Sequence, residues 1–297
     1  MLFSEMVTCG ALIHGDARQF LRHGDDDPCA LQVGGNDPEQ LQLCTQMAED
    51  AGYQEVNLNV GCPSDRVQQG EIGACLMARP ELVAACFSQM QSKVRIPVSV
   101  KCRTGIDNQD SYEAFRRFVE TVADAGCRVF YVHARKAFLQ GLSPRENRQI
   151  PPLRYDFVYR IREDLPDCDF YLNGGLRSAE DSLQQLDLVK GIMLGRAAYQ
   201  SPYLLAELER AVYGFTSPGR LEVVDAYLSY AADTQSEHIR PRHLLRHLPG
   251  LFKGQSGARQ FRRHLSEQLN SNPTSLQIVA DALEVSGLSE PEQRLAS

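Results

Sequence analysis

The sequence of 297 residues contains no long hydrophobic run and no basic stretch at its start. Its apolar runs, such as residues 129–132, are far shorter than the roughly 20 residues that a membrane-spanning helix needs. The first residues also lack the positive charge that begins a secretory signal peptide. We therefore expect a cytoplasmic protein without a membrane segment.

The nine cysteines include no Cys-x-x-Cys pair and no Cys/His spacing of the kind that binds zinc. An odd number of scattered cysteines is typical of reduced thiols, so we expect neither a disulfide framework nor a metal. Repeats and low-complexity segments are lacking as well. With 43% apolar and 23% charged residues, the chain is an ordinary globular protein with one large core, which excludes collagen, coiled coil and disorder.

Up to about residue 213, short apolar or β-branched runs alternate with helical patterns, which predicts a parallel sheet with crossover helices. Two of the predicted helices are 38–51, capped by Asp37, and 111–125, preceded by Asp110 and closed by Gly126. The predicted strands are residues 2–7, 29–33, 55–60, 97–101, 128–133, 169–173 and 190–194.

Seven strands are one fewer than a (β/α)₈ TIM barrel needs, and the sequence opens directly on a strand. We therefore predict a TIM barrel over residues 1–215 whose first βα unit is missing, and we attribute the gap to a truncated or misplaced start. Residues 140–156, which contain three prolines, are predicted to form a long loop after a strand of the barrel.

The composition changes after residues 214–219, because no strand-like run follows them. Amphipathic patterns at 221–232, 242–252 and 258–269 predict a small all-α domain over residues 216–297. The formal net charge of the chain is -7, yet residues 238–264 hold seven Lys or Arg, four His and no Asp or Glu. This basic segment is the one part of the chain that favours a polyanionic partner.

Polar residues and glycines follow six of the predicted strands, at the edge where a parallel barrel carries its active site. They are Gln32, Asn57, Asn59, Lys101, Arg103, His133, Arg135, Asn173-Gly174-Gly175 and Gly195-Arg196. The glycine turns could hold a phosphate through their backbone amides, although tight turns alone would also explain them. Lys101 and His133 would suit an electron-rich ring with a phosphate tail, and Gln32 could contact the edge of that ring.

Cys62 lies in a loop with Gly61, Pro63 and Ser64, just past a predicted strand, where regular core packing is not expected. Other cysteines, such as Cys44, fall within or beside predicted helices and should be buried. An ordinary thiol has a pKa near 8.5 and is mostly protonated at neutral pH. Beside a hydride donor, Cys62 could therefore supply the proton that completes the reduction of a C=C bond.

At these residues the sequence resembles the flavin-dependent tRNA-dihydrouridine synthases, most closely their A-type subfamily. The resemblance spans nearly the whole chain, and its most specific motif is Asn-x-Gly-Cys-Pro at residues 59–63. That motif lies within the stretch 57–67, and the other stretches are residues 5–7, 31–35, 100–103, 133–136, 141–144, 173–175 and 195–196. The family normally has a further strand with a Pro-Met pair upstream, which agrees with the missing barrel unit.

The resemblance implies that NADPH reduces a bound FMN. A D-loop uridine at tRNA position 20 or 20a would be flipped out of the tRNA, and the reduced FMN would pass a hydride to its C6 while Cys62 protonates its C5. FMN would be held by Gln32, Lys101, His133, Asn173, Gly174, Gly175, Gly195 and Arg196. The implied contacts with the uridine or the tRNA are Asn59, Arg103, Arg145, Arg148, Arg259, Arg262 and Arg263. We expect no obligate protein partner.

Three alternatives remain at this stage. The first is an FMN barrel enzyme of the dihydroorotate or dihydropyrimidine dehydrogenase kind, which acts on free pyrimidines and has no need of a basic helical tail. The second is a Schiff-base aldolase with Lys101 as the nucleophile, which would be colourless when pure. The third is a nonenzymatic RNA-binding protein, in which Cys62 would be dispensable.

Overall fold

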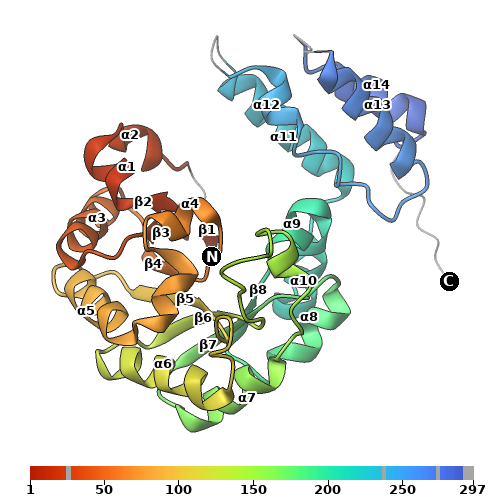
Figure 1. The fold of residues 1–297 in the computed structure, drawn as a ribbon. Helices are drawn as coiled ribbons and strands as arrows, with labels where there is room; N and C mark the ends of the chain where they lie inside the picture. Colours follow the sequence, from red (N-terminus) through yellow and green to blue (C-terminus); the bar gives the residue numbers. More distant parts are fainter. Residues whose placement is uncertain (25–27, 236–238, 272–274, 290–297) are drawn as a thin grey trace. The chain divides into compact units, whose positions relative to one another are not determined.

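The first 193 residues build a curled parallel sheet with helices on its outer side (Figure 1). The computed structural model describes residues 1–24, 28–235, 239–271 and 275–289. The strands run in the order β1-β3-β4-β5-β6-β7-β8, and β2 also pairs with β3. Their bounds are β1 Leu2–Phe3, β2 Val7–Thr8, β3 Cys29–Gly34, β4 Glu55–Val60, β5 Val98–Arg103, β6 Val129–His133, β7 Asp169–Asn173 and β8 Gly191–Met193.

This arrangement confirms the predicted TIM-barrel class of fold. Every strand pair in the described residues is parallel, as a succession of βα units requires. Between β1 and β8, the two ends of the strand order, the described residues form no pairing, so the sheet is open there. The carboxyl ends of the strands therefore meet at one edge of a curled sheet, where a TIM barrel places its site.

The predicted single strand at residues 2–7 was wrong, because two short strands take its place. Both pair with β3, but Phe3 lies opposite Ala30 whereas Val7 lies opposite Val33. Three residues between β1 and β2 thus face two residues of β3, which is the count of a β-bulge. Helix α1 (Cys9–His14) follows at once, capped by the hydroxyl of Thr8.

The predicted helices of the barrel are present, with one difference in capping. Helix α3 (Pro38–Asp50) begins after Asp37, whose carboxylate accepts from the backbone N–H of Gln40. Helix α6 (Tyr112–Asp124) is capped by the hydroxyl of Ser111, and Asp110 instead pairs with Lys136. The other barrel-unit helices are α2 Ala17–Phe20, α4 Asp65–Gln69, η1 Gly73–Ala78, α5 Pro80–Gln91, η2 Glu146–Arg148 and α7 Tyr155–Asp164.

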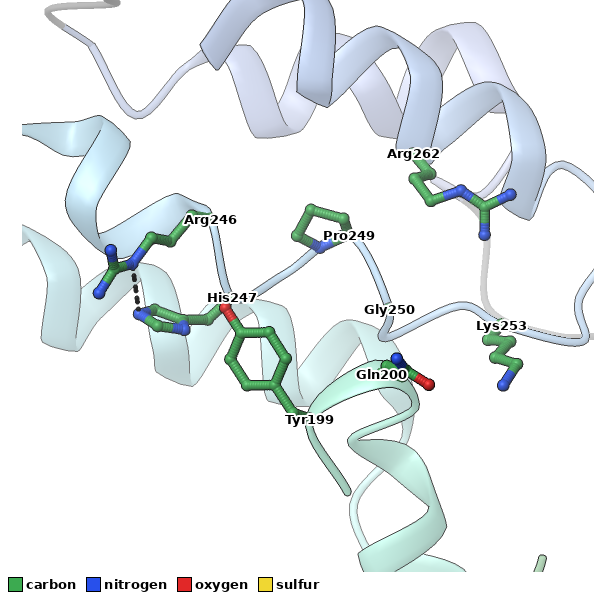
Figure 2. Close-up of a pocket in the computed structure, with 8 residues that line it drawn as sticks. All are labelled: Tyr199, Gln200, Arg246, His247, Pro249, Gly250, Lys253 and Arg262. Carbon is green, nitrogen blue, oxygen red and sulfur yellow. Dashed lines mark hydrogen bonds between the residues drawn. The ribbon is translucent and has the colours of Figure 1, made fainter. Parts of the chain in front are cut away.

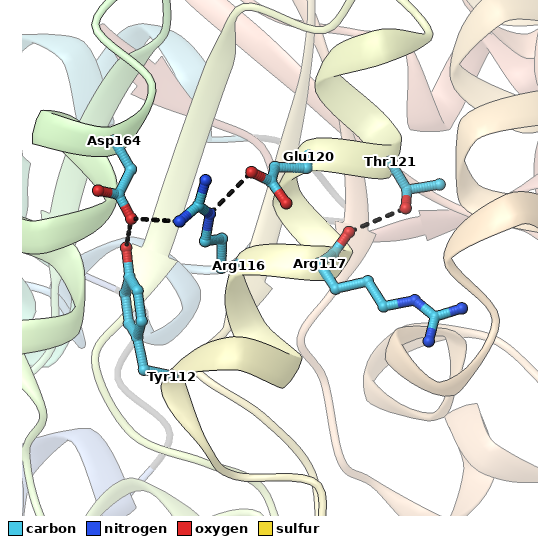
Figure 3. Close-up of polar contacts among 6 residues, drawn as sticks. All are labelled: Tyr112, Arg116, Arg117, Glu120, Thr121 and Asp164. Carbon is cyan, nitrogen blue, oxygen red and sulfur yellow. Dashed lines mark hydrogen bonds and ion pairs between the residues drawn. The ribbon is translucent and has the colours of Figure 1, made fainter.

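A polar cluster joins α6 to α7 on the outside of the barrel (Figure 3). The Tyr112 hydroxyl donates to Asp164 at 2.5 Å, and the same carboxylate pairs with Arg116 at 3.4 Å. Arg116 also donates to Glu120 one turn further along α6 at 2.7 Å. Burial and the Asp164 carboxylate raise the pKa of Tyr112. The cluster thus ties two neighbouring crossover helices together through a half-buried carboxylate.

The chain divides into two compact units, residues 1–175 with 184–193 and residues 176–183 with 194–297. The boundary predicted at residues 215/216 stays a prediction. Helix α8 (Ala179–Leu186) runs from the second unit into the first. The remaining helices of the second unit are α9 Arg196–Gln200, α10 Tyr203–Tyr213, α11 Arg220–Thr234, α12 Pro241–Leu245, α13 Ala258–Asn270 and α14 Ile278–Ser286.

The core of the second unit includes Leu245, Phe252, Phe261 and Leu265. The helix predicted over 242–252 was wrong beyond Leu245, because turns that contain Pro249 and Gly250 follow α12. His238, the first residue of the basic segment, lies outside the described residues. Within the described part of the chain, no helix is both long and apolar enough to cross a membrane.

Candidate active site

The concave face of the sheet is lined by polar side chains that alternate with core residues. On β4, Val56 and Leu58 belong to the hydrophobic core that the outer helices share. Because side chains alternate along a strand, Glu55, Asn57 and Asn59 point to the opposite, concave face. All three are buried there. This polar face extends from β3 to β7 and surrounds the edge where the predicted cofactor residues lie.

Three predicted cofactor residues come together at the carboxyl ends of β5, β6 and β7. The Lys101 ammonium donates to the Asn173 amide oxygen at 3.1 Å, and His133 lies opposite Asn173 in the sheet register. The Asn173 amide in turn donates to the backbone of Met193 at 2.7 Å, which anchors it to β8. Burial, with the neighbouring charge of Arg103, lowers the pKa of Lys101 to about 8.

The turn after β7 requires glycine at two successive positions. Gly174 has φ of +106° and Gly175 has φ of +79°, values that L side chains rarely adopt. A Cβ on Gly174 would lie 2.5 Å from Cδ2 of His133, so the backbone packs directly on that ring. The turn therefore brings bare backbone beside His133 and Lys101. A cation, amide groups and a half-buried glycine backbone form a donor set that fits a flavin ring with a phosphate tail.

Gly195 and Arg196 belong to the second compact unit. Gly195 precedes the short helix α9, and a Cβ on it would meet no atom within 4 Å. The part of these two residues in cofactor binding stays a prediction. Gln32, on β3, lies in the first unit and bonds to both Asn57 and Asn59 at 2.9 and 2.7 Å.

Asn59 holds the loop that carries Cys62. Its amide oxygen accepts from the backbone N–H groups of Gly61 and Cys62 at 3.1 and 2.9 Å. The Cys62 thiol is half-buried and lies 3.5 Å from the hydroxyl of Ser64. By contrast, Cys44 is fully buried, as predicted, and so are Cys86 and Cys127. The loop thus presents a thiol at the carboxyl end of β4.

Arg103 joins the Cys62 loop to the long loop after β6. Its Nε donates to the Gly61 carbonyl at 2.9 Å, and its Nη1 donates to the carbonyls of Lys136 and Asn147 at 3.1 and 2.9 Å. The side chain is only 3% exposed. This geometry favours a clamp between two loops over the contact with substrate or tRNA predicted for Arg103.

The long loop is built around Asn147, a fully buried residue that the sequence reasoning missed. Its amide bonds to the backbone N–H and carbonyl of Phe138 at 2.7 and 2.9 Å. Arg145 and Arg148 flank Asn147 and are exposed. Their predicted contact with tRNA is compatible with that exposure and stays a prediction. An isolated Asn in a polar loop carries no sequence signal that would have revealed its buried position.

Helix α13 presents the three predicted tRNA-binding arginines to solvent. Phe261 and Leu265 are buried on one side of the helix, while Arg259, Arg262 and Arg263 are exposed. The three arginines therefore lie away from the buried side of the helix.

Arg262 also lines a pocket of about 350 Å³ within the second unit (Figure 2). Arg246 and Lys253 line the same pocket, and none of its described lining residues is acidic. The rings of Tyr199 and His247 meet edge to face at 5.6 Å in its wall. Desolvation and the Arg246 charge lower the pKa of His247. The pocket is therefore cationic through its arginines and lysine, with an aromatic wall.

The comparison with known families identifies the chain. Residues 1–285 match the family described as dihydrouridine synthase (Dus). In the described residues, no group of three or more His, Cys, Asp or Glu side chains could hold a metal ion. A polar barrel mouth with a loop thiol agrees with this match.

Three similar proteins carry the name tRNA-dihydrouridine(20/20a) synthase. The protein from Vibrio cholerae is 47% identical over 286 residues, which cover 95% of this chain and 88% of that one. The one from Shewanella oneidensis is 48% identical over 281 residues, 94% of this chain and 84% of its own. The protein from Synechocystis is 48% identical over 294 residues, which cover 97% of this chain and 88% of that one. The chain belongs to the dihydrouridine synthase family and is an oxidoreductase, which confirms the resemblance.

Proposed function

We propose that this enzyme reduces the C5=C6 bond of uridines 20 and 20a in the D-loop of tRNA to give 5,6-dihydrouridine. The observation that carries the proposal is the Cys62 loop, which Asn59 holds at the same sheet edge as Lys101 and the glycine turn. Relatives that share nearly half of their residues with this chain bear the name of that activity. Because its substrate is tRNA, we assign the enzyme to the cytoplasm.

FMN is the proposed cofactor, and NADPH the proposed reductant. Gln32, Lys101 and His133 would hold the ring, and the Asn173–Gly175 turn with Gly195 and Arg196 would hold the phosphate tail. Lys101 is the one ammonium among these groups, and its half-buried position strengthens its attraction for an anionic oxygen. When bound and reduced, FMN supplies a hydride for C6 of the uracil ring.

The Cys62 thiol donates the proton to C5, so that one hydride and one proton together saturate the double bond. The thiol is then restored by a proton from solvent. Asn59 keeps the thiol in place through the backbone of its loop, and Arg103 fixes the same loop at the Gly61 carbonyl. Two independent anchors therefore restrict the position of the acid.

The tRNA would be gripped by the cations of the helical unit while one uridine is extruded into the barrel mouth. Arg259, Arg262 and Arg263 would contact phosphates, and the pocket beside Arg262 has cations and an aromatic edge suited to a nucleotide. Arg145 and Arg148 are further candidates at the barrel. A free pyrimidine would have no use for these groups, which disfavours the dehydrogenase alternative.

Mass spectrometry of tRNA fragments tests the proposed function. The purified protein is incubated with FMN, NADPH and tRNA that lacks dihydrouridine, and the D-loop fragment should gain the mass of two hydrogens at each of positions 20 and 20a. Unmodified D-loops together with reduction of free pyrimidines would overturn the proposal. Dihydrouridine elsewhere in the tRNA would leave the reaction intact and refute the assigned positions.

A further inference from the structure

A continuous chain of side-chain hydrogen bonds crosses the concave face of the barrel, away from the Cys62 loop. Asn59 donates to Gln32 at 2.7 Å, and Gln32 donates to Asn57 at 2.9 Å. Asn57 then donates to the Ser99 hydroxyl at 2.7 Å, and Ser99 donates to a carboxyl oxygen of Glu55. The chain thus begins at the amide that holds Cys62 and ends at a buried acid.

Every donor in this chain points in the same direction. Each amide side chain offers an oxygen on one side and an NH₂ group on the other, so reversing one amide would set two oxygens or two NH₂ groups face to face. The Asn59 oxygen must face the N–H groups of Gly61 and Cys62, which accept nothing. The loop therefore depends on the orientation of the whole chain.

Glu55 fixes that orientation at the far end. A hydroxyl such as that of Ser99 can donate either to Asn57 or to Glu55. Because the Glu55 carboxyl group accepts from it, the hydroxyl donates to Glu55. Ser99 must then receive the NH₂ side of Asn57, and the same constraint passes through Gln32 to Asn59. Tyr131 also donates to Glu55, at 3.3 Å, from the other side and outside the chain.

We propose that Glu55 and Ser99 are positioning residues for Cys62, which act through the orientation of the Asn59 amide. The assignment rests on the proposed function, because it concerns the acid of that reaction. Glu55 is 5% exposed, and an acid buried to that degree costs stability unless its oxygens are hydrogen-bonded, as they are here by Ser99 and Tyr131. Burial raises the pKa of Glu55, and in either protonation state one of its oxygens can accept from Ser99.

Two variants, each of which lacks one hydroxyl that donates to the Glu55 carboxyl group, test the proposal. Ser99→Ala breaks the chain, whereas Tyr131→Phe removes a hydroxyl that contacts Glu55 from outside it. Hydrogen exchange is measured in the full-length, FMN-loaded protein on the peptide that contains the Gly61 and Cys62 amides. We expect about tenfold faster exchange in Ser99→Ala and wild-type exchange in Tyr131→Phe. Equal exchange in the two variants, fast or slow, would overturn the proposal.

A second pair of variants changes Glu55 itself. Glu55→Gln retains an oxygen that can accept from Ser99, whereas Glu55→Leu does not. With reduced enzyme and saturating tRNA, we expect Glu55→Leu to form dihydrouridine about tenfold more slowly, with an unchanged KM for tRNA, and Glu55→Gln to restore the rate. Failure of the Gln variant to rescue would contradict the proposal. Exchange needs no tRNA, so it remains informative even if the wild-type enzyme fails to modify its proposed substrate.

Discussion

Cys62 and Cys75 are both half-buried, but their surroundings differ. The backbone N–H of Cys62 is bound by Asn59 at the barrel mouth, whereas the Cys75 thiol donates to the carbonyl of Ile72 at 3.2 Å. Desolvation raises the pKa of Cys75. The chain therefore offers a matched control for the thiol assigned to proton donation.

Replacement of Cys62 by Ala should lower the rate of dihydrouridine formation at least about a hundredfold, because the general acid is lost. Reduction of the flavin by NADPH should continue at the wild-type rate, since the thiol takes no part in it. Rapid-mixing measurements of both half-reactions separate the two effects. Cys75→Ala should match the wild type in both, and a Cys62→Ala enzyme with full product formation would refute the role.

Lys101 should make FMN binding depend on pH. Its pKa of about 8 in the protein means that the ammonium loses its proton as the pH rises past that value. A charged Lys101 attracts an anionic ligand and a neutral one does not, so the affinity should be highest below pH 8 and fall above it. The fall is at most tenfold per pH unit. Quenching of FMN fluorescence from about pH 7 to about pH 9.5 measures it.

The Lys101→Met variant provides the control for that titration. It should bind FMN more weakly at low pH and show no fall in affinity as the pH rises. An identical pH dependence in the variant and the wild type would place the titrating group elsewhere.

At the residue scale, the sequence predicted the groups that the loops present, because a Gly-Cys-Pro loop and strand-end polar residues are local patterns. Cys62, Lys101 and Asn173 were singled out in this way. Glu55 and Ser99 were not, because they lie toward the amino ends of β4 and β5, away from the carboxyl ends at which a parallel barrel carries its active site. The period-2 pattern of Glu55, Asn57 and Asn59 was the one signal that could have revealed a polar interior.

At the scale of elements, α6 and α7 are joined by the Tyr112–Asp164 bond. Tyr112→Phe should lower the free energy of unfolding by about 1 kcal/mol, because the buried hydroxyl gives up one hydrogen bond to a carboxylate. Tyr230→Phe, at a tyrosine that is 55% exposed, should leave stability unchanged. Urea unfolding of both variants measures the difference, and equal midpoints would show that the bond contributes nothing.

Helix α13 should supply part of the grip on tRNA. Replacing Arg259, Arg262 and Arg263 together by Gln should weaken tRNA binding and flatten its dependence on salt, by about 0.9 in the log–log slope for each phosphate that is no longer neutralised. A filter-binding series over salt concentration gives the slope. The control replaces three exposed cations of the barrel unit, Lys93, Arg95 and Arg117. If both triple variants flatten the slope equally, the arginines of α13 contribute no more to tRNA binding than other exposed cations do.

The elements themselves were predicted where local signals are strong. Asp37 and Pro38 set the start of α3, and Gly126 follows α6 at a positive φ. The bulge between β1 and β2 was missed because its register depends on β3, whose paired residues lie 26 or 27 positions away in sequence. Helix α12 was predicted too long because amphipathic spacing continues past Leu245, although Pro249 and Gly250 interrupt the helix.

At the scale of the whole molecule, charge is segregated along the chain. The segment 238–264 carries seven Lys or Arg and no Asp or Glu in a protein whose formal net charge is -7. Such segregation leaves the acidic remainder to repel RNA while the basic segment attracts it, so the charge pattern favours one orientation of the tRNA. The barrel class could be predicted from the order of strands and helices, because each βα unit is a local pattern.

Anaerobic single turnover tests the central claim most directly, that a reduced flavin and the Cys62 thiol together saturate one uridine. Enzyme whose FMN has been reduced by NADPH, freed of excess NADPH, is mixed with tRNA that lacks dihydrouridine, and flavin absorbance and dihydrouridine are both followed. The account predicts one dihydrouridine for each flavin reoxidised, at equal rates. A protein that binds no flavin, or a flavin that stays reduced in the presence of tRNA, would contradict it.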